Sequence, residues 1–352
     1  MASLSGRVDG PPLPPPSGLV PALSWAGEVL RAWLGITVDP FGLLAERALL
    51  DGLTRRGTIS CGRATRLCAV ADGVVALSLA RPSDLDCVPA LLERAVDSTD
   101  PWDRIGQVLP TGPGSHWVER ATLLGIPCAV LGSVPAPTSG APAVRASSVP
   151  GAPAPTASLQ GLRVVDLSSL WAGPLCARLL QSAGASVVKV EGAGRPDGAR
   201  SGNAEFYRRL HDGQESMVID LSSDGERRQL ASLLTDADIV IEASRPRALE
   251  QWGLGPDRFV GTGRLRAWVS ITGYGRTGPH RDRVAFGDDA AVAGGLVAWE
   301  HGQPRFCSDA IADPLTGITS ALAVICALMK GGSWLLDVAM ARVAAACAGE
   351  SC

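Results

Sequence analysis

Asp313 is the residue whose type and position could do chemistry most directly. It stands in the segment Ala310–Gly317, immediately before Pro314 and an apolar stretch that predicts a helix over Pro314–Met329. An acid at this position has a structural interpretation, the N-cap of the helix with proline in the first helical position. The alternative is a nucleophile, because the helix dipole favours an ionised carboxylate at the N-terminus. The local pattern alone favours the N-cap.

A glycine pattern of the dinucleotide-binding type, GxGxxG, occurs over Gly273–Gly278 directly after a predicted strand. It leads into the charged segment Pro279–Arg283 instead of an apolar helix, so we expect no helix N-terminus to hold a pyrophosphate there. The loop Ser168–Gly173 also lacks these glycines, although Glu191 ends a strand where an acid that binds a ribose would stand. We therefore expect no NAD-type cofactor.

Cysteines and histidines show no metal-binding pattern. The nine cysteines form no CxxC pair, and the four histidines, at positions 116, 211, 280 and 301, lie at ligand spacing from no cysteine. Most of the cysteines are expected to be reduced residues of the core. No metal site is predicted.

The second half of the chain predicts a sheet that could position these residues. Leu162–Leu167 and Ser186–Val190 are short apolar runs typical of buried parallel strands, and the helix between them carries Leu175, Leu179 and Leu180 on one face. Alternation continues with strands over Met217–Leu221, Ile239–Glu242, Ala267–Thr272 and Trp334–Val338, and helices over Asp224–Leu234, from Pro246, over Asp288–Trp299 and over Pro314–Met329. This order predicts an α/β fold with a doubly wound, mostly parallel, Rossmann-like sheet, which binds ligands at the carboxyl ends of its strands.

A smaller domain is predicted ahead of this sheet. Residues 1–18 are proline-rich and are expected to form a disordered lead-in. Residues 19–133 mix helical and strand patterns, which indicates a small α+β domain in which we expect no catalytic residue. Residues 134–158 are rich in Pro, Ala and Ser and predict a semi-extended linker. The α/β domain then occupies residues 159–352.

Composition excludes some classes of function. The 352 residues are 46% hydrophobic with a net charge of −3, which indicates a globular protein without a field for polyanions, so no nucleic-acid partner is expected. The N-terminus lacks the apolar core of a signal peptide, and the longest apolar run, Ala321–Met329, is shorter than the ~20 residues that span a bilayer. We expect a cytoplasmic protein with no membrane partner.

The second part of the chain resembles the family III CoA transferases, the CaiB/BaiF group that includes formyl-CoA transferase and the α-methylacyl-CoA racemases. The motifs that carry this resemblance, in the family's order, are LQGLRVVDLSSLWAGP, GASVVKVE, VIDLSSDGERRQLASLLTDADIVIEASRPRALEQWGL, SITGYGRTGP, ADPLTG and LLDVAM. Weaker motifs at residues 71–77 and 125–131 resemble the family's smaller domain. That domain usually follows the large one, so the resemblance implies a permuted domain order.

The resemblance places the family's catalytic aspartate at Asp313. Its carboxylate would attack an acyl-CoA thioester, give a mixed anhydride and then an aspartyl-CoA thioester, and pass CoA to a carboxylic acid acceptor. Backbone amides of Gly294–Gly295 or of the helix after Asp313 would stabilise the oxyanions. The resemblance also implies that no cofactor is bound permanently, that acyl-CoA is a substrate, and that the protein forms a homodimer, which is interlocked in the family.

The resemblance also implies where CoA binds. The candidate contacts are Trp171, Ala172, Gly173, Arg200, Ala243, Ser244, Arg245 and Arg247. Guanidinium groups bind phosphates in a bidentate manner, which makes the three arginines candidate phosphate partners. The alternative is that they are ordinary surface arginines.

Two other functions stay open. The racemases pair the aspartate with a histidine, and here the corresponding segment is Phe286-Gly287-Asp288, in which Gly287 cannot shuttle protons. An acyl-CoA racemase or isomerase is therefore one alternative to CoA transfer. Ala243-Ser244 and Gln251 replace residues common in the family, and no glycine-rich flap is found. A CoA-binding protein without turnover is the other alternative.

Overall fold

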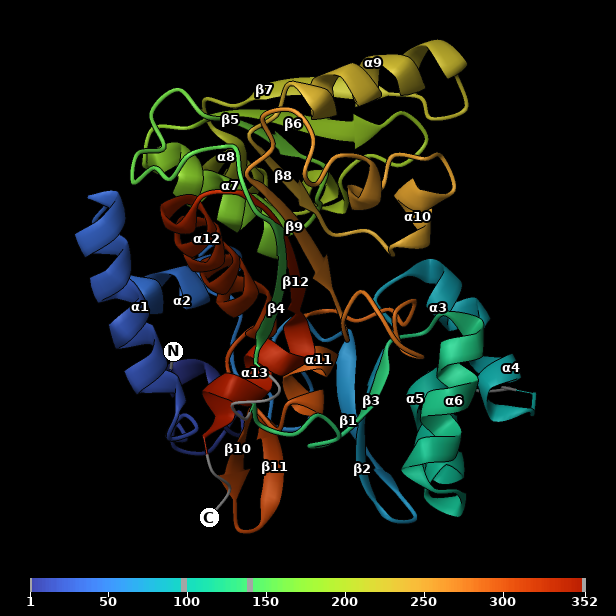
Figure 1. The fold of residues 1–352 in the computed structure, drawn as a ribbon. Helices are drawn as coiled ribbons and strands as arrows, with labels where there is room; N and C mark the ends of the chain where they lie inside the picture. The colour runs from blue at the N-terminus through green and yellow to red at the C-terminus, as the bar shows by residue number, and fades with distance from the viewer. Residues whose placement is uncertain (1, 96–99, 138–141, 350–352) are drawn as a thin grey trace.

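The fold is built on a seven-stranded sheet. The computed structural model describes residues 2–95, 100–137 and 142–349. The strands of the large sheet are β4 (Val144–Val149), β5 (Arg163–Asp166), β6 (Ser186–Gly192), β7 (Glu215–Ile219), β8 (Ile239–Glu242), β9 (Ala267–Thr272) and β12 (Ser333–Ala339). Their order is β4-β12-β9-β8-β5-β6-β7, and all neighbours are parallel except β4, which is antiparallel to β12 (Figure 1). The predicted α/β fold with a mostly parallel sheet is confirmed.

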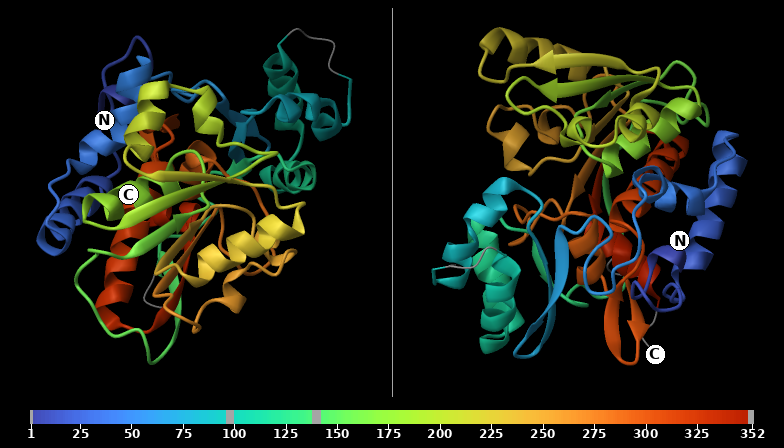
Figure 2. Two further views of the ribbon diagram at one scale, coloured as in Figure 1. Left: turned by 90° about the horizontal axis from the view of Figure 1, so that it is seen from above. Right: turned by 180° about the vertical axis from the view of Figure 1, so that it is seen from behind.

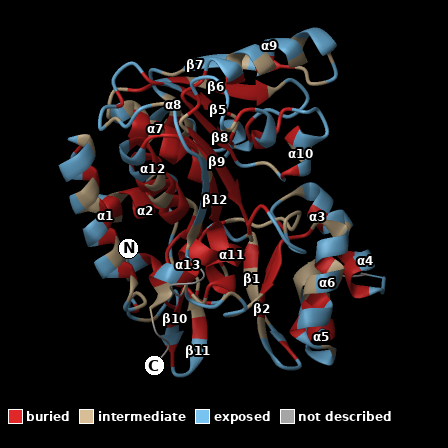
Figure 3. Ribbon diagram, viewed as in Figure 1, coloured by how far each residue is buried: buried red, intermediate tan, exposed pale blue. Residues whose placement is uncertain are grey.

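Helices cover both faces of this sheet. They are α7 (Ala172–Ser182), α8 (Ala204–His211) and α12 (Ala312–Lys330) on one face, and α9 (Asp224–Thr235) and α10 (Arg247–Glu250) on the other. Val164 and Ile241 pack toward the first group, whereas Val165 and Val240 pack toward the second. A strand buried on both faces needs apolar residues at successive positions, which explains the continuous apolar runs (Figure 3).

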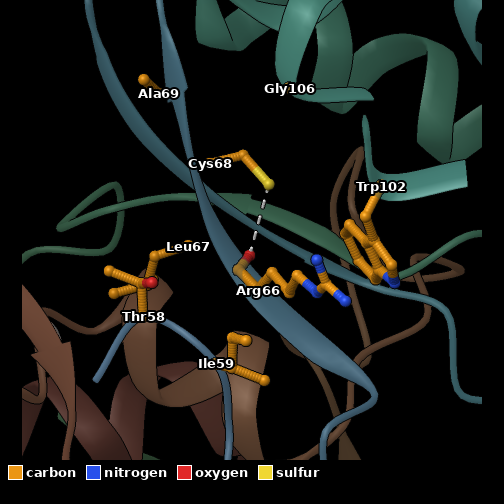
Figure 4. A pocket seen from close by; sticks show the side chains of 8 residues that line it. All are labelled: Thr58, Ile59, Arg66, Leu67, Cys68, Ala69, Trp102 and Gly106. Atoms are coloured by element: carbon orange, nitrogen blue, oxygen red, sulfur yellow. Dashed lines mark hydrogen bonds between the residues drawn. The ribbon is translucent and has the colours of Figure 1, made fainter. Parts of the chain in front are cut away.

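A second, antiparallel sheet lies to one side, with its own core (Figures 1 and 2). It contains β1 (Thr65–Val70), β2 (Gly73–Ser78) and β3 (Cys128–Val130), and its helices are α3 (Pro82–Asp86), α4 (Val88–Leu92), α5 (Pro101–Val108) and α6 (Gly114–Leu124). A cavity of about 280 Å³ lies beside β1, and Figure 4 shows side chains that line it. The Arg66 guanidinium lies 4.6 Å from the centre of the Trp102 ring. This cavity contains none of the predicted site residues.

The N-terminal helices pack on the large sheet's helices. α1 (Leu19–Leu34) and α2 (Pro40–Asp51) bury Leu23, Leu30 and Leu44 in the same core as α12. The expected lead-in also contains the buried Ser5, and the expected linker contains β4, which pairs with β12. From composition we expected residues 19–133 to form one small domain, with extended segments on either side. Composition does not specify which core an amphipathic helix joins, and α1 and α2 join the core of the large sheet.

The predicted helix over Asp288–Trp299 is confirmed at its beginning and is wrong at its end, where a strand replaces the helix. The chain forms α11 (Gly287–Ala293) and then a hairpin of β10 (Val297–Glu300) and β11 (Gln303–Phe306). Gly295, with φ of 73°, takes a left-handed conformation that ends the helix and turns the chain. The remaining elements of the described residues are α13 (Met340–Ala348) and the 3-10 helices η1 (Ala2–Leu4), η2 (Leu109–Thr111), η3 (Gly198–Ser201) and η4 (Pro256–Arg258).

Helix α12 occupies the centre of the larger core. Within the described residues, it is the one helix long and apolar enough to cross a membrane, and 72% of its most apolar window is buried in the fold, as in a core helix. The eight cysteines that the structure describes are free thiols, and five of them are buried. No group of three or more His, Cys, Asp or Glu residues in these ranges is placed to hold a metal ion.

Candidate active site

Asp313 is the second residue of α12, and the interpretation of Asp313 as the N-cap is wrong. The helix begins at Ala312, and the N-cap residue, Ile311, makes no side-chain capping bond. The backbone N–H of Asp313 donates to the carbonyl of Ala310, at 2.9 Å, while its half-buried carboxylate accepts from the backbone N–H of Gly287. The carboxylate is therefore not used to cap its own helix.

The surroundings of Asp313 favour a carboxyl group that titrates near neutrality. Burial raises the pKa of Asp313 to about 7, the guanidinium of Arg47 opposes this rise, and the carboxylates of Asp288 and Asp309 add to it. Burial and Asp309 likewise raise the pKa of Asp288 to about 6. A weakly solvated carboxylate with a pKa near 7 is both available and reactive as a nucleophile at physiological pH.

Arg47 joins this site from α2, which lies in the region 19–133 where we expect no catalytic residue from the sequence. Its Nε lies 2.7 Å from Oδ2 of Asp309 and its Nη2 lies 2.6 Å from Oδ1. The same guanidinium lies 5.3 Å from the centre of the Trp171 ring. No local signal marks Arg47, because its partners are more than 100 positions away in the chain.

The turn after β5 is fixed from several sides. Trp171 is 2% exposed and packs edge-to-face on Phe206, with 5.2 Å between ring centres. Leu170 takes a φ of 71°, and its N–H donates to Asp197 at 2.9 Å. A Cβ at Gly173 would overlap the side chain of Ser168, so this position requires glycine. With its indole buried, Trp171 presents little surface to a ligand.

This turn is in contact with the Asp313 helix. Gly317, one turn after Asp313, would place a Cβ 2.7 Å from the carbonyl oxygen of Ala172. Glycine thus allows α12 to cross α7 closely at its N-terminal end. The structure therefore brings the predicted CoA turn, Trp171 to Gly173, to the candidate nucleophile.

Arg200, a predicted phosphate partner, is bound to the protein itself. Its Nη2 lies 2.7 Å from Oε1 of Glu191, and its guanidinium lies 4.6 Å from the centre of the Tyr207 ring. The hydrogen bonds from Arg200 lower the pKa of Glu191 to about 2. Any phosphate would compete with this carboxylate.

Arg245 and Arg247 belong to a basic cluster beyond β8, next to the exposed Ala243 and the half-buried Ser244. Partial burial, and then the charges of Arg247, Arg195 and Arg81, lower the pKa of Arg245, while Asp282 opposes them. β5 and β8 are parallel neighbours, and between them the order in which successive strands are added to the sheet reverses; the carboxyl ends of strands at such a point form the usual ligand crevice of this architecture. An excess of guanidinium groups here suits an anion.

Arg81 connects this cluster with Asp313. It comes from the smaller module, as we call the second sheet (β1–β3) with its helices α3 to α6, where Asp84 and the carbonyl of Gly125 hold its Nη2 at 2.6 Å each. Its guanidinium lies 5.7 Å from the centre of the Phe286 ring, directly before Gly287, whose N–H binds Asp313. Arg81 is thus close both to Arg245 and to the segment Phe286-Gly287 beside Asp313.

The expectation that Gly294 and Gly295 stabilise an oxyanion is wrong. Their amides donate to the carbonyls of Ala290 and Val292, at 3.1 and 3.0 Å. They lie at the far end of α11 from Gly287. The helix after Asp313 remains as the alternative.

The GxGxxG segment, Gly273–Gly278, forms a loop and does not lead directly into a helix, as expected. Its Arg276 is buried, and Nη1 lies 2.9 Å from Oε1 of Glu242. The loop is therefore an anchored structural element.

Comparisons with known proteins show which family the second part of the chain resembles. The family model for CoA-transferase family III matches residues 159–351. Succinyl-CoA–D-citramalate CoA-transferase of Chloroflexus aurantiacus is 32% identical over 184 residues, which is 49% of this chain and 46% of that protein. Probable fatty acyl-CoA transferase Rv3272 of Mycobacterium tuberculosis is 31% identical over 205 residues, 54% of this chain and 52% of that protein. The crystal structure of Rv3272 aligns with a TM-score of 0.49 and 32% identity over 54% of this chain and 55% of the other.

Because the family model covers more than half of the chain, the protein belongs to CoA-transferase family III. The chain spans about half the length of the curated relatives it matches.

Proposed function

We propose that the protein is an acyl-CoA:carboxylate CoA transferase with Asp313 as its nucleophile. The observation that carries this proposal is the half-buried carboxylate of Asp313, which is free of a capping role and has a pKa raised to about 7. Membership of family III and relatives named as CoA-transferases support the reaction class.

The proposed reaction transfers CoA from one carboxylic acid to another through covalent intermediates on Asp313. A carboxylate oxygen of Asp313 attacks the thioester carbonyl, the carbon–sulfur bond breaks, and the CoA thiolate leaves. The thiolate then attacks the aspartyl carbon of the mixed anhydride and expels the donor carboxylate, which gives an aspartyl-CoA thioester. The acceptor carboxylate repeats both exchanges in reverse, so Asp313 is regenerated and no net proton is consumed.

CoA is proposed to lie between the turn at Trp171 to Gly173 and the basic cluster. Arg245, Arg247 and Arg195 would bind its phosphates, because these guanidinium groups repel one another in the absence of an anion. Arg200 would contribute less, since Glu191 already holds it. The amides of the first turn of α12 would stabilise the oxyanions.

Racemase chemistry is disfavoured by Gly287. A Cβ at this position would lie 2.7 Å from Oδ2 of Asp313 and closer still to the carbonyl of Ala310. With this backbone, no side chain that could exchange a proton can stand beside Asp313 at position 287.

One assay separates the three functions. The full chain is incubated with an acyl-CoA donor and a panel of carboxylic acids in D2O, and the acyl-CoA products are separated by chromatography and mass spectrometry. A new acyl-CoA that forms only with an acceptor supports the transferase. Deuterium at the α-carbon without acyl transfer indicates a racemase or isomerase. Binding of CoA without either product indicates a protein without turnover.

We further propose that the smaller module, ahead of the large sheet in this chain, takes the place of the family's second domain, and that the protein is a cytoplasmic homodimer. Sedimentation equilibrium of the full chain tests the assembly. A monomer over the micromolar range would contradict it.

A further inference from the structure

The turn that precedes Asp313 is strained and is held from outside the family's matched segment. Ser308 and Ala310 have φ of 61° and 41°, a left-handed conformation that non-glycine residues rarely adopt. Such conformations persist when surrounding contacts over-determine them, and they concentrate at functional sites. The carbonyl of Ala310 accepts the N–H of Asp313, so this turn sets where the carboxylate stands.

Asp309, between the two strained residues, carries the strongest of these contacts. Its carboxylate is fully buried, and both oxygens are bound by Arg47, at 2.6 and 2.7 Å. A bidentate arginine–carboxylate pair fixes orientation as well as charge.

Further contacts hold the backbone of the same turn. The N–H of Ser308 donates to Oγ of Ser5 at 3.2 Å, and its carbonyl accepts from Sγ of Cys61 at 3.4 Å. The N–H of Ala310 donates to Asp288 at 3.0 Å. Ser5, Arg47 and Cys61 all precede residue 159, where the match to the family begins.

The charges around Asp313 also indicate a role for Arg47. Three carboxylates, Asp288, Asp309 and Asp313, meet in this region, and Arg47 is the one cation among the described groups that act on Asp313. Without Arg47, both the buried Asp309 and the candidate nucleophile would lose their compensating charge.

We propose that Arg47 is a positioning residue for Asp313: through its pair with Asp309 it holds the strained turn 308–310 and so sets the location and the ionisation of the nucleophile. This inference rests on the proposed function for its catalytic consequence, but not for its structural one. The N-terminal part of the chain is then a working part of the site.

The ionisation is tested by titration, without turnover. Aspartate labelled with 13C at the side-chain carboxyl is followed by NMR, and the Asp313 signal is assigned with Asp313→Asn. Asp309→Asn lowers the titration midpoint of Asp313, because a repelling carboxylate is removed and Arg47 is freed. Adding Arg47→Met to Asp309→Asn raises the titration midpoint of Asp313 by about 1 pH unit or more relative to Asp309→Asn alone. Because position 309 is then a neutral asparagine, the loss of Arg47 leaves no buried carboxylate unpaired there.

The positioning is tested by kinetics. Arg47→Lys keeps the charge but cannot bind both oxygens of Asp309, so kcat falls about tenfold or more with KM for acyl-CoA unchanged, while the acid limb of the pH profile stays in place. The matched control is Arg178→Met. Arg178 binds Glu46, a neighbour of Arg47 on α2, at 2.8 Å, and its removal should leave kcat and the pH profile unchanged.

The results separate this inference from the proposed function. An Asp313 midpoint that does not respond to Arg47→Met in the Asp309→Asn background, or full kcat in Arg47→Lys, overturns the role of Arg47. If the midpoint moves as expected and the wild-type protein transfers no acyl group, the positioning stands and the proposed function fails.

Discussion

The α-carbon of Gly287 faces the carboxylate of Asp313 so closely that a Cβ would lie 2.7 Å from Oδ2. The N–H of the same glycine donates to that carboxylate. One residue thus supplies a hydrogen bond to the candidate nucleophile and leaves no room for a side chain beside it.

Gly287→Ala is expected to displace Asp313 or the carbonyl of Ala310. A displacement of about 1 Å costs on the order of 100-fold in rate, and overpacking costs about 1–3 kcal/mol of unfolding free energy. Transfer kinetics and denaturant unfolding measure the two effects. Gly106→Ala, at a helical site with no atom within 4 Å, is the control and should leave activity unchanged. Full activity in Gly287→Ala would show that the close approach is not required.

The rate of transfer should depend on the ionisation of Asp313. Its folded pKa of about 7 means that the nucleophilic form predominates above pH 7 and is lost below it. We expect kcat/KM to fall about tenfold per pH unit well below pH 7 and to level off above it. A profile that is flat between pH 5.5 and 8 would indicate a different titrating group.

Asp289 should make the fold less stable as pH rises. Its fully buried carboxyl accepts the N–H of Phe286 at 2.8 Å, and burial raises its pKa to about 8, from 3.8 in the unfolded chain. The folded protein therefore keeps a proton that the unfolded chain releases, so stability declines between about pH 4 and pH 8.

Asp289→Asn keeps the acceptor and removes this dependence. Its melting temperature should exceed that of the wild type by several degrees at pH 8.5, at roughly 2–4 °C per kcal/mol, and by little at pH 4.5. Differential scanning fluorimetry across pH measures the difference. Asp257→Asn, an exposed change, should show none. An advantage of Asp289→Asn that is equal at both pH values would contradict the assignment.

The two kinds of candidate arginine should differ in binding CoA. Arg245→Met removes a guanidinium from a cluster of like charges and should weaken CoA binding about 10- to 100-fold. Arg200→Met should weaken it less, because Glu191 already binds that side chain. Isothermal titration with CoA at low and high salt provides the comparison. An equal loss of CoA affinity in both variants, or a larger loss in Arg200→Met, would indicate that the phosphates bind near Arg200 and Glu191 instead.

The sequence predicts the parts of the fold that are encoded locally. β8 and β9 match their predicted ranges, Ile239–Glu242 and Ala267–Thr272, because continuous apolar runs between turns define strands buried on both faces. The helix predicted over Asp288–Trp299 begins correctly but extends too far, because an apolar run has the same composition in a helix and in a hairpin.

Residues of the candidate site could be predicted from the sequence where a motif contains them, and not where only tertiary packing brings them together. Asp313 stands in the segment ADPLTG, which resembles the family's motif for its catalytic aspartate. This resemblance favoured a nucleophile, although the local pattern alone favoured an N-cap. No motif contains Arg47. Its proposed role depends on the packing of α2 against a turn 262 positions away in the chain, and no sequence spacing predicts that contact. The burial of Trp171 and the pairing of Arg200 likewise result from tertiary contacts.

Trapping with hydroxylamine tests the central claim, that Asp313 becomes acylated, most directly. The protein is incubated with an acyl-CoA donor, hydroxylamine is added, and peptides are sequenced by mass spectrometry. We expect a hydroxamate on Asp313 in the wild type and none in Asp313→Asn, which should also lack transfer activity. A hydroxamate on Asp309 or Asp288 instead, or full transfer by Asp313→Asn, would contradict it.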